Sequence, residues 1–290
     1  MEIWETDIKA CVAATMEWKD IVLMPLGDVQ LGALGCDEDK FRRHIEWGIK
    51  NDALFLGMGD YVDVASPSNR MNIKSIELYD SVHDALEQAA QSAVQRFLHL
   101  VEGTKGRWLG MLEGHHFWEF ADGTTSDTRI AQALAAPFLG NCAFVRLRFN
   151  HSKTSMTKYT VWCHHGVGGG MKVSAPLNRL ENLLAHHEAN MYLIGHHHKK
   201  VVAEIPRMYM TERKPYTIGD KPQIIACTGS FLKGYMAGSH NGNRPMGSYV
   251  EKKMLNPVGL GGLVFTLHPH ASNSKIRIDV GWSGSTGDPM

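Results

Sequence analysis

Residues 53–63 read ALFLGMGDYVD, an apolar run that ends at a glycine and continues directly into Asp60 and Asp63. An apolar run of this length bounded by glycine is typical of a buried strand. The same pattern recurs five times along the chain, at residues 21–26, 108–112, 160–163, 191–194 and 224–227. We therefore expect a fold built on short buried strands, each followed by polar residues.

Segments with helical spacing separate these runs. Asp37 is a suitable N-cap for the first of them, in which Phe41, Ile45 and Ile49 recur every four residues. The predicted helices cover residues 38–50, 82–101, 126–139 and 177–189. Strands that alternate with helices indicate the α/β class. Two further strands, at 263–267 and 275–280, follow one another without a helix.

The composition describes a folded chain with a sizeable core. The 290 residues are 43% hydrophobic, and 30 basic side chains balance 30 acidic ones, which excludes a disordered chain. Zero net charge argues against binding to nucleic acid by bulk electrostatics, although it leaves room for a local basic groove. We expect a single domain over 1–290, with a core at about 20–282 and a loose tail at 283–290.

Cysteine usage and hydropathy indicate a cytoplasmic protein. The five cysteines form no C-x-x-C pair, so we expect reduced thiols. The first 20 residues lack the basic and apolar regions of a signal peptide. No window approaches 18 continuous apolar residues, so no membrane partner is expected. The oligomeric state is left open.

The polar residues that follow the predicted strands form a candidate metal site. They are Asp28, Gln30, Asp60, His115, His116, His164, His165, His196 and His198. The carboxyl ends of strands in an open α/β sheet converge on one crevice, so these residues are expected to be neighbours. Imidazole and carboxylate together suit divalent transition metals. A carboxylate shared by two cations would give the two-metal geometry used on phosphate esters.

Five short motifs carry a family resemblance. They are Gly27-Asp28-x-Gln30, Gly59-Asp60-x-x-Asp63, Gly114-His115-His116, His165-Gly166 and Gly195-His196-x-His198. In this order, from about residue 20 to residue 230, they resemble the calcineurin-like metallophosphoesterases, whose pattern is D-x-H, G-D-x-x-D, G-N-H, H-G and G-H-x-H. The resemblance implies a four-layer α/β/β/α sandwich. The chain departs from the pattern at two positions, because Gln30 replaces a histidine and His115 replaces an asparagine.

The resemblance also implies a role for each site residue. Asp28, Gln30 and His198 would hold one divalent cation, His115, His165 and His196 would hold the other, and Asp60 would bridge them. His116 stands where the family has its catalytic histidine, and Asp63 would orient a ligand or the turn. Of the adjacent pair His164 and His165 we favour His165, since the family's ligand precedes a glycine. Manganese, zinc, iron and nickel all remain candidates for the two ions.

The activity implied is metal-dependent hydrolysis of phosphate esters. We favour a phosphodiesterase or nuclease acting on nucleotides or nucleic acid such as DNA, similar to the family's DNA-repair nucleases, because segments 207–222 and 244–253 each carry a net charge of +2. The alternatives are a phosphomonoesterase acting on a small molecule or protein and, from another class, a metal-binding scaffold in which Gln30 marks a degenerate site.

Overall fold

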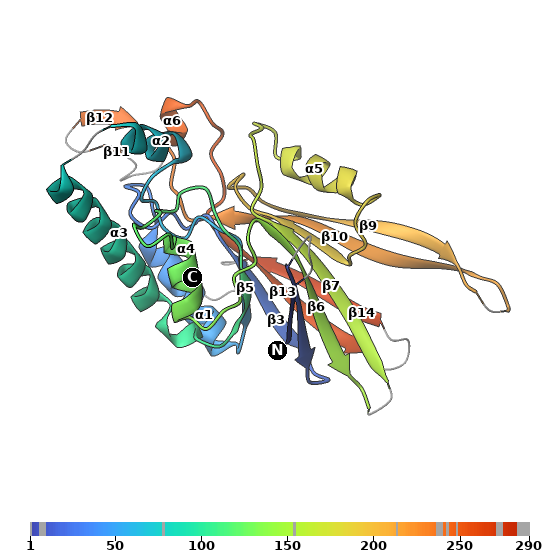
Figure 1. Ribbon diagram of the computed structural model, residues 1–290. Coiled ribbons are helices and arrows are strands. Elements are labelled where there is room, and N and C mark those ends of the chain that lie inside the picture. The colour runs from blue at the N-terminus through green and yellow to red at the C-terminus, as the bar shows by residue number, and fades with distance from the viewer. Residues whose placement is uncertain are drawn as a thin grey trace.

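A computed structural model describes residues 2–5, 10–76, 79–152, 155–212, 214–235, 240–241, 244–247, 249–270 and 275–282. Twelve of the described strands form one sheet that folds back on itself as two halves (Figure 1). The halves join where β10 pairs with β13 at Gly229–Gly262 and Ser230–Gly261. A Cβ on Gly229 would lie 2.1 Å from the carbonyl oxygen of Gly261, so this junction requires glycine.

The first half of the sheet contains seven strands, in the order β1, β2, β6, β7, β8, β10 and β9. Their bounds are Glu2–Glu5, Ala10–Met16, Cys142–Asn150, Met156–His164, Met191–Ile194, Ile218–Ser230 and Lys200–Met210. The second half runs from β14 through β13, β3 and β4 to β5. Its strands cover Lys275–Trp282, Gly261–His270, Ile21–Leu26, Leu54–Gly57 and Trp108–Met111, and a separate pair, β11 (His240–Asn241) and β12 (Arg244–Gly247), lies outside this sheet.

The described helices lie on the two outer faces or above the strand ends (Figure 1). They are α1 (Glu38–Lys50), α2 (Pro67–Ser75), α3 (Asp80–Leu100), α4 (Ser126–Ala133), α5 (Ala175–Leu183), α6 (Tyr249–Lys252) and a 3₁₀ turn at Glu102–Thr104. The first helix has the predicted bounds, and the side chain of Asp37 accepts a hydrogen bond from the backbone N–H of Lys40, as an N-cap does. None of the described helices is both long and apolar enough to cross a membrane.

Three apolar clusters define the layers. Residues from both halves, such as Leu23, Val145 and Met191, form one core between the two sheet faces. Side chains of α1, α3 and α4 pack on the outer face of the β3–β5 half. Leu180 of α5 packs on the opposite outer face. The order is therefore helix, sheet, sheet, helix, which confirms the predicted α/β/β/α sandwich.

Some predicted boundaries are wrong. Helix α4 ends at Ala133 rather than 139, because the chain takes a left-handed conformation at Ala135 (φ 54°). Helix α5 ends at Leu183 rather than 189. Val12 of β2 also packs in the central core. The predicted tail at 283–290 lies outside the described residues.

Candidate metal centre

Every site residue predicted from the sequence lies just beyond the carboxyl end of a strand. Asp28 follows β3, Asp60 follows β4, His115 follows β5, His165 follows β7 and His196 follows β8. These strands belong to both halves of the sheet, and their ends meet where the two halves face each other. The fold thus brings together residues that are up to 170 positions apart in the chain.

The backbone at the site adopts an unusual conformation. Five of the candidate residues that are not glycine have a left-handed φ, namely Asp28 (48°), Gln30 (50°), Asp60 (54°), His196 (63°) and His198 (56°). Such a conformation is uncommon for side chains larger than glycine and typically costs about 1–3 kcal/mol per residue. Backbone strain of this kind clusters at functional sites because the surrounding structure must hold it in place. The presence of five left-handed residues in one site is therefore an independent indication of function.

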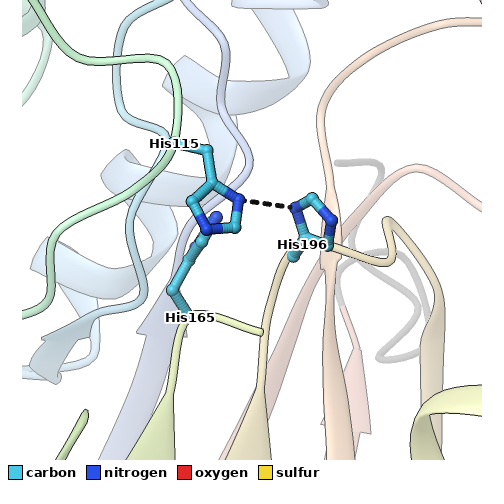
Figure 2. Close-up of side chains that lie close together, drawn as sticks. All are labelled: His115, His165 and His196. Carbon is cyan, nitrogen blue, oxygen red and sulfur yellow. Dashed lines mark hydrogen bonds between the residues drawn. The ribbon is translucent and has the colours of Figure 1, made fainter. Parts of the chain in front are cut away.

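Three histidines converge from three loops. Ring nitrogens of His115, His165 and His196 lie within 4.8 Å of one another. Figure 2 shows the rings directed toward a common point, with Nδ1 of His115 3.2 Å from Nδ1 of His196. The ring of His165 meets that of His115 edge to face, with centroids 4.6 Å apart. This arrangement could hold a single transition-metal ion.

A second group lies beside the first and shares His165 with it. Carboxylate oxygens of Asp28 and Asp60 and a ring nitrogen of His165 also lie within 4.8 Å of one another. The Nε2 atom of His165 is 3.4 Å from Oδ2 of Asp60. All three side chains are buried. His165 and Asp60 therefore connect the histidine cluster to the carboxylates.

Each carboxylate uses one oxygen for structure and leaves the other directed into the site. Oδ2 of Asp28 accepts a hydrogen bond from the backbone N–H of His196 at 2.8 Å. Oδ1 of Asp60 accepts from the backbone N–H groups of His115 and His116. The remaining oxygens, Oδ1 of Asp28 and Oδ2 of Asp60, are buried and have no hydrogen-bond partner among the described residues. Buried carboxylate oxygens of this kind need a cation or a proton, so the donor set fits divalent metals.

Gln30 and His198 complete the side of the site nearest Asp28. Nε2 of His198 lies 3.5 Å from Oδ1 of Asp28 and 3.1 Å from the side-chain nitrogen of Gln30. The three residues that the resemblance groups around one cation are therefore neighbours. The Gln30 amide faces the histidine ring, so its oxygen could reach a cation only after a rotation of the amide.

The predicted catalytic histidine is held by the predicted orienting aspartate. Nδ1 of His116 lies 2.7 Å from Oδ1 of Asp63, and Nε2 lies 4.0 Å from Oδ2 of Asp60. Burial alone would lower the pKa of His116, but the hydrogen bond to Asp63 and the nearby negative charges raise it above its usual value. His116 thus presents Nε2 to the site and favours its protonated form.

The electrostatics of the cluster reflect two buried carboxyls next to imidazoles. Burial raises the pKa of Asp28 to about 8. Burial opposes protonation of His165, yet the negative charge of Asp60, 3.4 Å away, raises the pKa of His165 to about 9, and the same pairing lowers the pKa of Asp60 against the effect of burial. Burial lowers the pKa of His196 and of His198 to about 4. Metal binding requires neutral imidazoles and ionised carboxylates, so His196 and His198 are already in that state, whereas His165 and Asp28 would release a proton when a cation binds.

The structure places His165, and not His164, in the cluster. Nδ1 of His165 lies 2.6 Å from the carbonyl oxygen of Met58, which leaves Nε2 directed at Asp60. His164 accepts a hydrogen bond from the backbone N–H of Gly166 at 2.7 Å and lies against the ring of Trp162, with centroids 5.8 Å apart. The side chains of the two histidines therefore have different surroundings.

Two residues that support the site were not predicted from the sequence. Nη1 of Arg70 lies within 2.8 Å of three carbonyl oxygens, those of Ala65, His115 and Phe117. The buried carboxylate of Asp127 accepts a hydrogen bond from the backbone N–H of Gly114 at 2.8 Å. Both side chains shape the loop that carries His115 and His116. Both side chains contact backbone atoms, so no residue pattern in the sequence predicts these contacts.

Comparisons with known proteins were made for sequence and structure. No protein-family model and no curated protein sequence matches the chain. Among solved structures, a conserved uncharacterised protein from Streptococcus pneumoniae, described as a predicted phosphoesterase, is similar with 10% identity and a TM-score of 0.33, covering 90% of this chain and 88% of that one. Wild-type Vps29 complexed with zinc, from Entamoeba histolytica, is similar with 8% identity and a TM-score of 0.34, covering 90% and 99%.

The order of the layers and the position of the site agree with what the sequence resemblance implies. Two sheet faces pack against each other between outer helices, and the polar loops of the five motifs meet at one end of this sandwich. The histidine and carboxylate groups that could bind metal come from these loops. The chain therefore forms the α/β/β/α sandwich that the resemblance implies, with the candidate metal ligands gathered at one end of it.

Proposed function

We propose that this protein is a metal-dependent hydrolase of phosphate esters, acting on phosphodiesters of nucleotides or nucleic acid. The observation that carries the proposal is the pair of buried carboxylate oxygens, Oδ1 of Asp28 and Oδ2 of Asp60, that face imidazole nitrogens and have no hydrogen-bond partner among the described residues. A purely structural aspartate at a turn would satisfy both of its oxygens with nearby N–H groups. In each of these two aspartates, only one carboxylate oxygen accepts hydrogen bonds.

The resemblance divides the candidate ligands into two groups. Asp28, Gln30 and His198 would hold one divalent ion, and the cluster of His115, His165 and His196 would hold the other. Asp60 lies next to both groups and would bridge them. Bound there, two divalent cations would neutralise phosphate charge and supply an acidified water as nucleophile. Manganese, zinc, iron and nickel all suit imidazole and carboxylate ligands.

The chain's own residues would position the substrate and move the proton. His116 keeps its Nδ1 against Asp63, so its Nε2 is free to donate a proton to the leaving oxygen. Its raised pKa favours the protonated form that this role needs. The backbone N–H groups of His115 and His116 hold Asp60 in place, so the proton donor and the bridging carboxylate are fixed relative to each other.

A second candidate function is a metal-binding scaffold without turnover. Gln30 supports it, because the family's imidazole is replaced by an amide whose nitrogen lies against His198. A phosphomonoesterase with the same machinery is the third candidate. Metal content and substrate preference separate the three.

The test measures metal content by elemental analysis and hydrolysis of bis-p-nitrophenyl phosphate, p-nitrophenyl phosphate and single-stranded DNA. The variant Asp60→Asn removes the bridging charge, and Asp84→Asn, at an exposed position of α3, is the matched control. We expect diester hydrolysis that Asp60→Asn abolishes together with metal binding, while Asp84→Asn retains both. Full metal occupancy and turnover in Asp60→Asn would overturn the proposal, and metal binding without any hydrolysis would identify the scaffold.

A further inference from the structure

The outer face of the β6–β10 half of the sheet is covered by a helix over part of its length. Near the metal centre, Leu180 of α5 packs with Trp162, Tyr192 and Ile225. Figure 1 shows α5 above this part of the sheet, while the β9–β10 ribbon extends well beyond it. Toward the amino ends of β7 and β8, no described helix covers the same face. The strands there line a groove that is open to solvent.

Strand alternation places basic side chains on this open part of the face. Side chains two or four positions apart in a strand point to the same side. Arg146 lies two residues from Phe144 and Lys158 four residues from Trp162, and both aromatic side chains pack in the cluster under α5. Lys221 of β10 and Arg207 of β9 are paired directly across the ribbon. Each lies four positions along its strand from a residue of the same cluster, Ile225 in β10 and Ala203 in β9. All four cations are exposed. We call Arg146, Lys158, Arg207 and Lys221 the basic face.

The charge of the basic face is not neutralised. None of its four cations forms an ion pair with a described residue. Among the described acidic residues that line this region, Glu204 and Asp220 alternate to the opposite face of the β9–β10 ribbon, and Glu188 remains on this side of the sheet. The chain as a whole carries no net charge, so this excess of positive charge is a local feature. A concentration of uncompensated cations on one surface attracts an anionic partner.

The size of the surface indicates an extended partner. From β6 to β9 the basic face spans four inter-strand spacings, which amounts to about 19 Å. On this face the same side chains line a groove together with residues 184–190, the segment after α5. A row of charges along an open groove suits a polymer with regularly spaced phosphates better than a single phosphate group.

We propose that the basic face binds single-stranded nucleic acid and holds it for the metal centre. The groove favours a chain over a flat lipid surface, because it is lined on one side by residues 184–190, which follow α5, and on the other by residues of the β9–β10 ribbon. Tyr209 lies beside Lys221, with the ammonium 5.1 Å from the ring centroid, and the residue is 37% exposed. A positively charged groove with an accessible aromatic ring is the usual means of binding single strands.

The basic face is separate from the catalytic machinery. Lys158 precedes His164, the last residue of β7, by six residues, or about 20 Å along the strand. Because α5 covers the sheet between these two points, a bound polymer would have to pass beside α5 to reach the metal centre at the other end. The inference specifies single-stranded nucleic acid as the substrate of the proposed hydrolase, and its catalytic part rests on that proposed function. Binding itself does not depend on hydrolysis.

The test is binding of fluorescein-labelled oligothymidylate, about 20 nucleotides long, followed by fluorescence anisotropy in EDTA, which prevents cleavage. The variant Lys158→Gln with Lys221→Gln removes two cations of the basic face. The matched control is Arg43→Gln with Lys50→Gln, which removes two exposed cations of α1 on the opposite outer layer. Single strands give a salt slope of about −0.7 per phosphate contact, so loss of two contacts should reduce the slope by about 1.4.

We expect the basic-face variant to bind at least tenfold more weakly at about 100 mM salt, with this smaller slope, while the α1 control binds like the unmodified protein. Hydrolysis of bis-p-nitrophenyl phosphate should be unchanged in both variants. Equal weakening in both variants, an unchanged slope, or no binding by the unmodified protein would overturn the proposal. Preferential binding of phosphatidylserine vesicles or polyglutamate would also overturn it. Absence of hydrolysis with retained binding would overturn only the proposed function.

Discussion

The Nδ1 atom of His116 lies 2.7 Å from Oδ1 of Asp63, although the two residues are 53 positions apart. The neighbouring His115 has a different environment, because its ring contacts those of His165 and His196. Adjacent histidines on one loop thus face different partners. His116 is directed at a carboxylate that would orient a proton donor, and His115 lies in a cluster that could hold a metal ion.

This difference predicts separate losses for the two histidines. His115→Ala should lower metal stoichiometry, and added metal should restore part of the activity because the remaining chemistry is intact. His116→Ala should retain both metals and lose about 10²–10⁴-fold in rate, the usual contribution of a positioned acid or base. The loss in His116→Ala should be smaller for p-nitrophenolate, a leaving group that needs little protonation. Elemental analysis and rates on esters with good and poor leaving groups provide the check.

Two results would contradict this assignment. If His116→Ala lost metal and His115→Ala did not, the roles would be reversed. If the loss in His116→Ala were equal for good and poor leaving groups, His116 would contact phosphate without transferring a proton. Asn178→Ala, at an exposed position of α5, provides a control for substitution at this end of the fold.

Gln30 provides the second prediction. Replacement by histidine restores the imidazole of the family pattern beside His198 and Asp28. Gln30→His should bind the second metal equivalent more tightly, because a neutral imidazole is a better ligand for transition metals than an amide. A chelator-competition titration measures the affinity. An unchanged affinity would show that the side chain at this position does not reach the cation, and Gln91→His, on α3, tests for non-specific gain of metal binding.

The sequence predicted the strands that end at the site because each is a continuous apolar run bounded by glycine. It did not reveal β2 and β6. In β6 the buried residues Val145 and Leu147 alternate with Arg146 and Arg148, so no continuous apolar run is present. The alternation arises because this strand buries one face in the central core and exposes most of the other. The same alternation produces the basic face.

Motif order was sufficient to bring the candidate ligands together, because the ends of parallel strands meet by topology. The supporting contacts could not be predicted in this way. Arg70 donates to carbonyl oxygens of a loop about 45 residues further along the chain, and a backbone carbonyl is identical in every residue. The left-handed backbone at His196 and His198 was also not predicted, because histidine adopts this conformation more often than most residues but that preference alone does not locate it in a sequence.

Arg70 carries the third prediction. Its guanidinium supports three carbonyls around His115 and His116 and stacks on the Phe117 ring at 3.9 Å. Arg70→Met should loosen this loop and reduce metal affinity or rate by about 10–100-fold, the usual effect of removing a residue that orients ligands. Arg70→Lys should recover part of the loss. Arg96→Met, which breaks an exposed ion pair with Glu38, is the control. Unaltered chelator titrations and rates in Arg70→Met would exclude a positioning role.

The last prediction concerns acid stability and does not involve the metal centre. His44 of α1 is fully buried, and neither ring nitrogen has a hydrogen-bond partner among the described residues. Burial, reinforced by the charges of Lys200 and Lys40, lowers its pKa to about 3. The unfolded chain binds a proton at this position below about pH 6.5, whereas the folded chain does so only near pH 3. Stability should therefore be lost as the pH falls from about 6.5 toward 3.

The magnitude follows from the slope of about 1.4 kcal/mol per pH unit for one proton, which gives about 2 kcal/mol between pH 7 and pH 5. His44→Leu has a similar volume and no titratable group, so its free energy of unfolding should fall by about 2 kcal/mol less over this range than that of the unmodified protein. His83→Leu, at an exposed position of α3, is the matched control for replacing a histidine by leucine. Urea unfolding at both pH values measures the difference. Because the metal-site carboxyls and histidines are the same in all three proteins, their titration cancels in the comparison. An identical loss in His44→Leu would mean that this histidine becomes protonated in the folded state.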